Sequence, residues 1–176
     1  MPGRILASQQ IYSGQALKLR VDTIEKPDGN KVRREIVEHA DCIAVVVLDE
    51  YKNVVMVKQL REAVDKLLLE IPAGGIDSGE TPADAVHREL QEEIGFLPQK
   101  IDRIGGFYST PGYCTEYLYL YLATELKPSR LEADDTENIK VEKVPVSQIP
   151  ALIASGAICD AKSIAGLLSY IYLKSQ

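Results

Sequence analysis

The glutamates of one short segment constrain this chain more than any other feature. Glu89, Glu92 and Glu93 lie at spacings i, i+3 and i+4, so a helix would bring the three carboxylates onto one face. Like charges at this separation repel each other, whereas a hard divalent cation binds through oxygen ligands of this kind. The spacing therefore predicts a metal site on a helix, suited to chemistry at phosphate groups.

The residues around the glutamates predict where this helix begins and ends. Thr81 can cap its N-terminus, Pro82 suits the first helical position, and Asp84 stands where a capping box places its acid. Gly95 suits the left-handed residue that follows a helix. We therefore expect a loop over residues 74–80, then a helix that stops at Gly95.

Arg88 is the cation placed at the border of the acidic face. It can pair with Glu92, four residues further on, or with an acid of the preceding loop, and so hold the metal ligands in place. A solvated helix charge is the alternative. The opposite side of the helix is apolar, and its expected core residues are Ala83, Val86, Leu90 and Ile94.

The complete pattern resembles the Nudix box, Gly-x5-Glu-x7-Arg-Glu-U-x-Glu-Glu-x-Gly-U, in which U is apolar. Gly74, Glu80 and residues 88–96 (RELQEEIGF) fill every fixed position. The resemblance implies an α/β fold, a three-layer α/β/α sandwich with a mixed sheet. It also implies a Nudix pyrophosphohydrolase that uses a divalent metal, Mg²⁺ with Mn²⁺ as the alternative.

The flanks of the box resemble the ADP-ribose pyrophosphatase branch of the family. The lead-in EIPAG occupies residues 70–74, the strand end VKQLR occupies residues 57–61, and STPG at 109–112 is followed by Glu116. Thr110 departs from the Ser-Pro-Gly of that branch. The implied reaction is hydrolysis of ADP-ribose to AMP and ribose 5-phosphate. Related branches act on other nucleoside diphosphate derivatives, such as GDP-mannose or NADH, and carry similar flanks.

The resemblance assigns roles at the metal site. Glu89 and Glu93 would be the principal metal ligands, Glu92 would share a bridging or supporting role, and the Ala73 carbonyl would be a further ligand. The residues expected to give structural support are Gly74, Glu80, Arg88 and Gly95.

The catalytic base and the substrate contacts are expected outside the helix. In this branch the base comes from a loop after the box, where Glu137 is the first choice and Glu132, Asp134 and Asp135 are alternatives. A helix glutamate such as Glu92 could instead activate water directly. The expected substrate contacts are Arg61, Glu70, Ser109, Pro111, Gly112 and Glu116. Arg61 leads them because a guanidinium suits phosphate recognition, although a surface charge is its alternative role.

Composition limits the remaining possibilities. The chain has 176 residues, a net charge of −6 and a pI near 5.0, which argues against an extended nucleic-acid surface. The three cysteines fit neither a CxxC motif nor a disulfide framework. We see no signal peptide and no apolar run of membrane-spanning length, so we expect a cytoplasmic protein with a small-molecule nucleotide-sugar substrate.

The N-terminal segment is expected to form a separate layer of strands. Residues 16–24 and 31–38 flank turn residues and predict antiparallel strands. We therefore expect N-terminal strands over residues 1–40, which the resemblance implies form a dimerisation sheet, and a catalytic domain over residues 41–176. A non-catalytic ADP-ribose sensor is the competing function, and the intact box glutamates argue against it.

Overall fold

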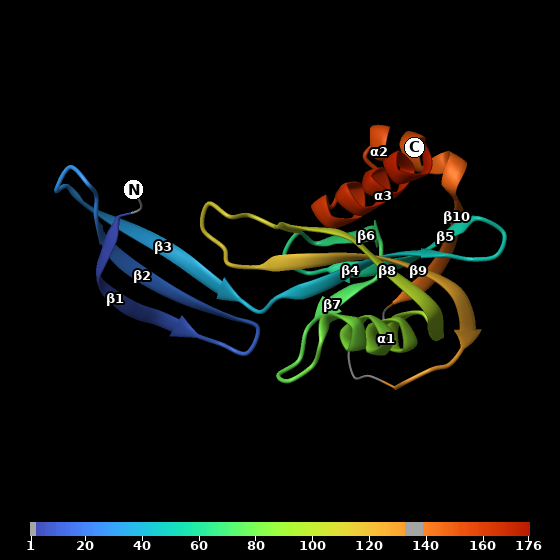
Figure 1. The fold of residues 1–176 in the computed structure, drawn as a ribbon, viewed down its shortest axis with the longest axis horizontal. Coiled ribbons are helices and arrows are strands. Elements are labelled where there is room, and N and C mark those ends of the chain that lie inside the picture. Colours follow the sequence, from blue (N-terminus) through green and yellow to red (C-terminus); the bar gives the residue numbers. More distant parts are fainter. Residues whose placement is uncertain (1–2, 133–138) are drawn as a thin grey trace. The chain divides into compact units, whose positions relative to one another are not determined.

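The computed structural model describes residues 3–132 and 139–176 and divides the chain into two compact units. The first unit runs to Asp41 and also includes Tyr108–Tyr117, while the second comprises Cys42–Phe107 and Leu118–Gln176. Figure 1 shows the elements of both units. The box helix belongs to the second unit.

The first unit is built on a three-stranded antiparallel sheet. Its strands are β1 (Arg4–Ser13), β2 (Leu17–Glu25) and β3 (Lys31–His39), in the order β1-β2-β3. The turn between β2 and β3 is held by Asp28, whose carboxylate accepts bonds from the Asn30 backbone and side-chain nitrogens at 3.0 and 2.9 Å. The predicted N-terminal antiparallel strands are confirmed. The bounds of β1 were not predicted from the pattern of apolar and polar residues, because nearly all of its side chains are exposed.

The second unit is organised around a seven-stranded mixed sheet in the order β10-β5-β4-β9-β8, with β6 paired to β5 and β7 to β4. β4 and β9 run parallel, and β4 pairs antiparallel with β5 and β7. These strands are β4 (Cys42–Leu48), β5 (Asn53–Arg61), β6 (Lys66–Glu70), β7 (Ala73–Gly75), β8 (Phe96–Tyr108), β9 (Tyr117–Pro128) and β10 (Lys140–Pro145).

Helices cover both faces of this sheet (Figure 1). The apolar run of β4 explains the arrangement, because its alternate residues enter two separate cores. Ile43, Val45 and Val47 pack with the apolar face of α1 (Pro82–Glu93). Ala44 and Val46 pack in the core that also contains residues of α2 (Ile149–Ala154) and α3 (Ala161–Lys174). The predicted three-layer α/β/α sandwich is therefore confirmed.

The C-terminal part of the described chain is helical. It forms a 3-10 turn at Val146–Gln148, followed by α2 and α3. Within residues 3–132 and 139–176, none of the helices combines the length and the apolar character needed to cross a membrane.

Candidate active site

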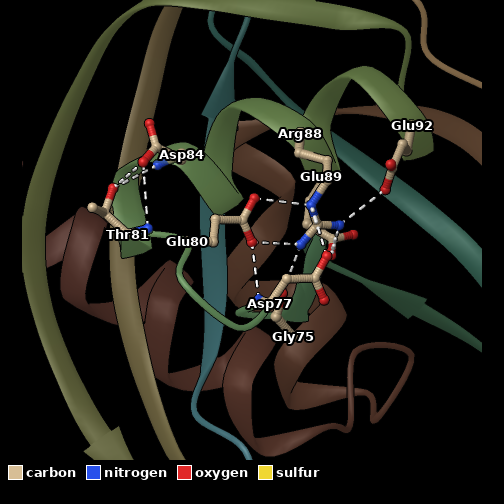
Figure 2. A network of polar contacts seen from close by, with 8 residues as sticks. All are labelled: Gly75, Asp77, Glu80, Thr81, Asp84, Arg88, Glu89 and Glu92. Atoms are coloured by element: carbon tan, nitrogen blue, oxygen red, sulfur yellow. Dashed lines mark hydrogen bonds and ion pairs between the residues drawn. The ribbon is translucent and has the colours of Figure 1, made fainter.

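The box helix α1 begins with the predicted capping box (Figure 2). The Asp84 backbone nitrogen donates to Thr81 Oγ1 at 3.2 Å, and the Thr81 nitrogen donates to Asp84 Oδ2 at 3.3 Å. Pro82 occupies the first turn. Gly95 follows the helix with φ +74°, a left-handed conformation that favours glycine. These local signals fix both ends of the helix that carries the glutamates.

One face of α1 is buried against the sheet and sets the direction of the acidic face. Val86, Leu90 and Ile94 are buried as expected. Ala83, which was also predicted for this face, is only partly buried, and Ala85 is fully buried instead. The helix is therefore rotated slightly from the idealised wheel. Glu93, next to Ile94, is turned inward as a result of the same packing.

Arg88 joins the acidic face to the preceding loop, as Figure 2 shows. Its Nε and Nη2 donate to the two carboxylate oxygens of Glu80 at 3.0 and 2.9 Å. Nη1 donates to Glu89 at 2.6 Å and to Glu92 at 3.1 Å, and Nη2 also reaches the Gly75 carbonyl at 2.8 Å. Arg88 thus contacts Glu92 and a loop acid together, and is not a solvated charge.

These contacts shift the pKa values of the ion pair in opposite directions. The bond from Arg88 lowers the pKa of Glu80, and the bond to Glu80 raises the pKa of Arg88. Glu80 also accepts a bond from the Asp77 backbone nitrogen at 3.0 Å. The charged state of both side chains is thus favoured, and the loop before the helix is tied to the helix itself.

Glu93 is the most deeply buried carboxylate of the box. Its side chain is only 7% exposed, and it accepts a bond from the Ala73 backbone nitrogen at 3.3 Å. Burial, reinforced by the negative charge of Glu89, raises the pKa of Glu93 to about 8. The site therefore disfavours a second negative charge unless a cation compensates it.

The charged form of Glu89 is also disfavoured by burial. Burial raises the pKa of Glu89, although Arg88 opposes the rise. Its carboxylate lies directly against the backbone of Gly74, so closely that a Cβ atom at position 74 would overlap it. Gly74 therefore leaves the space into which the Glu89 carboxylate fits.

The donor set fits a hard divalent cation. The carboxylates of Glu89, which is largely withdrawn from water, and Glu93, which is buried, repel each other and have raised pKa values. A bound cation would relieve both effects. Ala73 lies in β7 next to Glu93, and Glu92 is held by Arg88 at the edge of the group. These four residues are the candidates to hold the metal.

Arg61 and Glu70, two predicted substrate contacts, bind each other at the ends of β5 and β6. Arg61 Nε and Nη2 donate to Glu70 Oε1 and Oε2 at 2.9 and 2.7 Å. Glu70 is 1% exposed, and a third residue, Lys162 of α3, also donates to it. Burial alone would raise the pKa of Glu70, but its bonds with Arg61 and Lys162 outweigh burial and lower it.

The contact between Lys162 and Glu70 was not predicted from the sequence. The one sequence signal near Lys162 is Asp160, a residue type that caps helices. Its side chain caps α3 by accepting a bond from the Ser163 backbone nitrogen at 3.1 Å. That signal predicts a helix start but not its neighbour, because Lys162 and Glu70 are 92 residues apart in the chain.

The remaining predicted contacts belong to the first unit. They are Ser109, Pro111, Gly112 and Glu116, and the Ser109 backbone nitrogen donates to the Glu116 carbonyl at 3.2 Å. Glu116 also lies 3.6 Å from His39 Nδ1. Glu132 is exposed, whereas Glu137, Asp134 and Asp135 lie outside the described residues. The functional roles of all these residues stay predictions.

We expect Gly74→Ala to weaken metal binding because its new Cβ would displace the Glu89 carboxylate. Affinity for Mn²⁺, measured by titration calorimetry, should fall roughly tenfold or more. Gly75→Ala is the matched control, since a Cβ there meets nothing within 4 Å. Equal Mn²⁺ affinities for the two variants would contradict the packing argument.

The raised pKa of Glu93 predicts how stability depends on pH when no metal is bound. Between the ordinary value of 4.5 and about 8, the folded state keeps a proton that the unfolded state has released. The free energy of unfolding in EDTA should therefore fall as pH rises through this window, with Glu93 contributing on the order of 1–4 kcal/mol.

Urea unfolding at pH 5 and pH 8 measures this effect. Glu93→Gln should lose much of the difference between the two pH values, because glutamine does not titrate. Glu35→Gln, which replaces an exposed glutamate on β3, should keep the wild-type difference. An unchanged pH dependence in Glu93→Gln would show that Glu93 titrates normally.

Comparisons with known proteins agree with the box. The NUDIX domain family model matches residues 38–167. The chain is 35% identical over 173 residues to an ADP-ribose pyrophosphatase of Bacillus subtilis (strain 168), covering 97% of this chain and 93% of that protein. It is 30% identical over 183 residues to a GDP-mannose pyrophosphatase of Cronobacter sakazakii, covering 96% and 95%.

A solved structure has the same fold. The crystal structure of an ADP compounds hydrolase matches with a TM-score of 0.91, covering 100% of this chain and 96% of that chain at 20% identity. At this identity the likeness speaks for the fold alone, whereas the family model and the relatives rest on sequence. Together with the complete box on α1, they establish that the chain belongs to the Nudix family.

Proposed function

We propose that this chain hydrolyses the pyrophosphate bond of ADP-ribose to give AMP and ribose 5-phosphate. The observation that carries the proposal is the pair Glu89 and Glu93 on α1, within a complete Nudix box. The Glu93 side chain is buried and that of Glu89 is only 12% exposed. The similarity to an ADP-ribose pyrophosphatase over nearly the whole chain supports this substrate. Similarity to a GDP-mannose pyrophosphatase makes hydrolysis of another nucleoside diphosphate derivative the second candidate.

Nudix hydrolases generally need divalent metal ions, and we propose Mg²⁺ here, with Mn²⁺ as the alternative. Glu89 and Glu93 would be the principal ligands, joined by the Ala73 carbonyl, and Glu92 would bridge or support them. A bound divalent ion supplies positive charge that neutralises phosphate oxygens and makes water a better nucleophile.

Side chains of the protein position the carboxylates and accept the proton of the attacking water. Arg88 holds Glu89 and Glu92 against the loop, so the carboxylates keep their geometry between turnovers. In the reaction, water forms a bond to one phosphorus, the bridging P–O bond breaks, and the bridging oxygen leaves with the other phosphate. The proton of the water passes to a carboxylate base, for which Glu137 is our first choice.

The Arg61 guanidinium is suited to the substrate phosphates. Nε and Nη2 are bound to Glu70, whereas Nη1 has no hydrogen-bond partner among residues 3–132 and 139–176. The side chain is 39% exposed. Glu70 thus fixes one edge of the guanidinium and leaves the other edge available to an anionic oxygen.

A panel of substrates tests the proposal. The protein is incubated with Mg²⁺ and ADP-ribose, GDP-mannose, NADH or UDP-glucose, and the released nucleoside monophosphate is measured by chromatography. We expect ADP-ribose to have the highest kcat/KM and excess EDTA to abolish turnover. Preference for another member of the panel would select the second candidate function. Undiminished turnover in EDTA would refute the metal-dependent reaction.

The choice of base has its own test. Glu137→Gln should lower kcat by about 10²–10⁴-fold, the usual contribution of a general base, and leave Mn²⁺ affinity nearly unchanged. Glu35→Gln, which replaces an exposed glutamate of β3, is the control and should keep the wild-type kcat. If Glu137→Gln keeps the wild-type kcat, the base is another residue, and the other candidates are Glu132, Asp134, Asp135 and the helix residue Glu92.

We also propose a homodimer that pairs through the strands of residues 1–40. Ile5, Ile11 and Tyr12 of β1 each expose half or more of their surface, which favours a covered sheet. Light scattering at micromolar concentration is expected to give twice the mass of the 19.4 kDa chain, and a monomer mass would contradict it. A cytoplasmic location is proposed as well, since the three cysteines stand as thiols in the described part of the chain.

A further inference from the structure

The first turn of α3 makes a charged contact with the strand that leads into the box. Lys162 Nζ donates to Glu70 Oε2 and, at 2.8 Å, to Asp160 Oδ2. The Lys162 side chain is 16% exposed, so its charge is largely removed from water. A lysine in such a place is retained only with partners of opposite charge.

The same turn fastens the backbone between β6 and β7. Ser163 Oγ accepts a bond from the Ile71 backbone nitrogen at 2.8 Å. Gly166, one turn further along α3, packs so tightly that a Cβ there would lie 2.8 Å from Ile71 Cδ1. The segment from Glu70 to Ala73 is therefore held by α3, and it ends at the nitrogen that contacts Glu93.

Lys162 balances the charge of a cluster of four side chains. It contains two cations, Arg61 and Lys162, and two carboxylates, Glu70 and Asp160. Removing Lys162 leaves a single guanidinium for two carboxylates that are both largely buried. The freed acceptor sites on Glu70 and Asp160 would then attract the Nη1 edge of Arg61, which has no hydrogen-bond partner among the described residues.

The cluster also lies within electrostatic reach of the box. Glu70, which binds both cations, lies three residues before Ala73, and the Ala73 nitrogen donates to Glu93 at 3.3 Å. A diphosphate held beside Glu93 would therefore lie within reach of the same two cations. Loss of either cation makes this region more negative and less favourable to an anionic substrate.

We propose that Lys162 is a positioning residue for the diphosphate substrate. By sharing the Glu70 carboxylate with Arg61, it holds the guanidinium in place and keeps Nη1 free for a phosphate oxygen. Glu70 is then a positioning residue too, and not a substrate contact. The inference rests on the proposed function in one respect, that the substrate is a diphosphate bound near Glu93.

Steady-state kinetics of Lys162 variants test the role. We expect Lys162→Met to raise KM for ADP-ribose roughly tenfold and to leave kcat within about threefold, because ground-state and transition-state binding of the diphosphate weaken together. Lys162→Arg keeps the charge and should restore KM to within about threefold of wild type. Lys174→Met removes the other lysine of α3 and should leave both constants unchanged.

A double variant separates positioning from direct contact. If Lys162 acts through Arg61, the variant Arg61→Ala with Lys162→Met should have the same KM as Arg61→Ala alone. If the two substitutions raise KM independently, so that their factors multiply in the double variant, the proposal is overturned, because Lys162 would then bind substrate by itself. An unchanged KM in Lys162→Met, with only a lower melting temperature, would overturn it in favour of a purely structural contact.

The outcome does not depend on the folding of one variant or on one substrate. Lys162→Gln, which keeps one donor group, replaces Lys162→Met if melting curves show that the latter does not fold.

If the wild type prefers another diphosphate, the same KM ratios are measured with that substrate, and the Lys162 proposal stands while the ADP-ribose assignment fails. Calorimetry with ADP-ribose in EDTA should show binding weakened roughly tenfold in Lys162→Met. A wild type that neither binds nor hydrolyses any diphosphate overturns both.

Discussion

The repulsion between two carboxylates that are largely withdrawn from water is the constraint on which the site depends. Glu89 and Glu93 lie on one helix, largely removed from water, and the pKa of each is raised chiefly by burial. A fold keeps such a pair only if other interactions outweigh the cost. Here the apolar face of α1, sealed against β4, supplies the packing that turns Glu93 inward.

Three cations of the second unit, Arg61, Arg88 and Lys162, have two different tasks. Arg88 neutralises the outer acids, Glu80, Glu89 and Glu92, and ties the loop to the helix. Arg61 and Lys162 serve the buried Glu70 on the strand side. Among the described residues, Glu93 has no ion pair of its own and only a backbone donor. A divalent ion bound at this carboxylate would supply the positive charge that it lacks.

The parts of this arrangement that are local in sequence could be predicted, and the parts that join distant segments could not. The capping box, the stop at Gly95 and the Arg88 contacts all follow from spacings of at most a few turns. The sandwich was predicted from the family resemblance. Neither source could bring Lys162 to Glu70, because only the packing of α3 on the sheet decides which residue of its first turn meets that carboxylate.

Gly74 of β7 is in direct contact with the box helix. Its backbone occupies the space beside Glu89 where a side chain would otherwise stand. The preceding residue, Ala73, donates to Glu93, so two successive residues of β7 contact the two glutamates. Arg88 donates to the carbonyl of Gly75, which adds a third contact between β7 and the helix. The short strand β7 thus helps to position both carboxylates, and an ion shared between them would have to fit the separation that results.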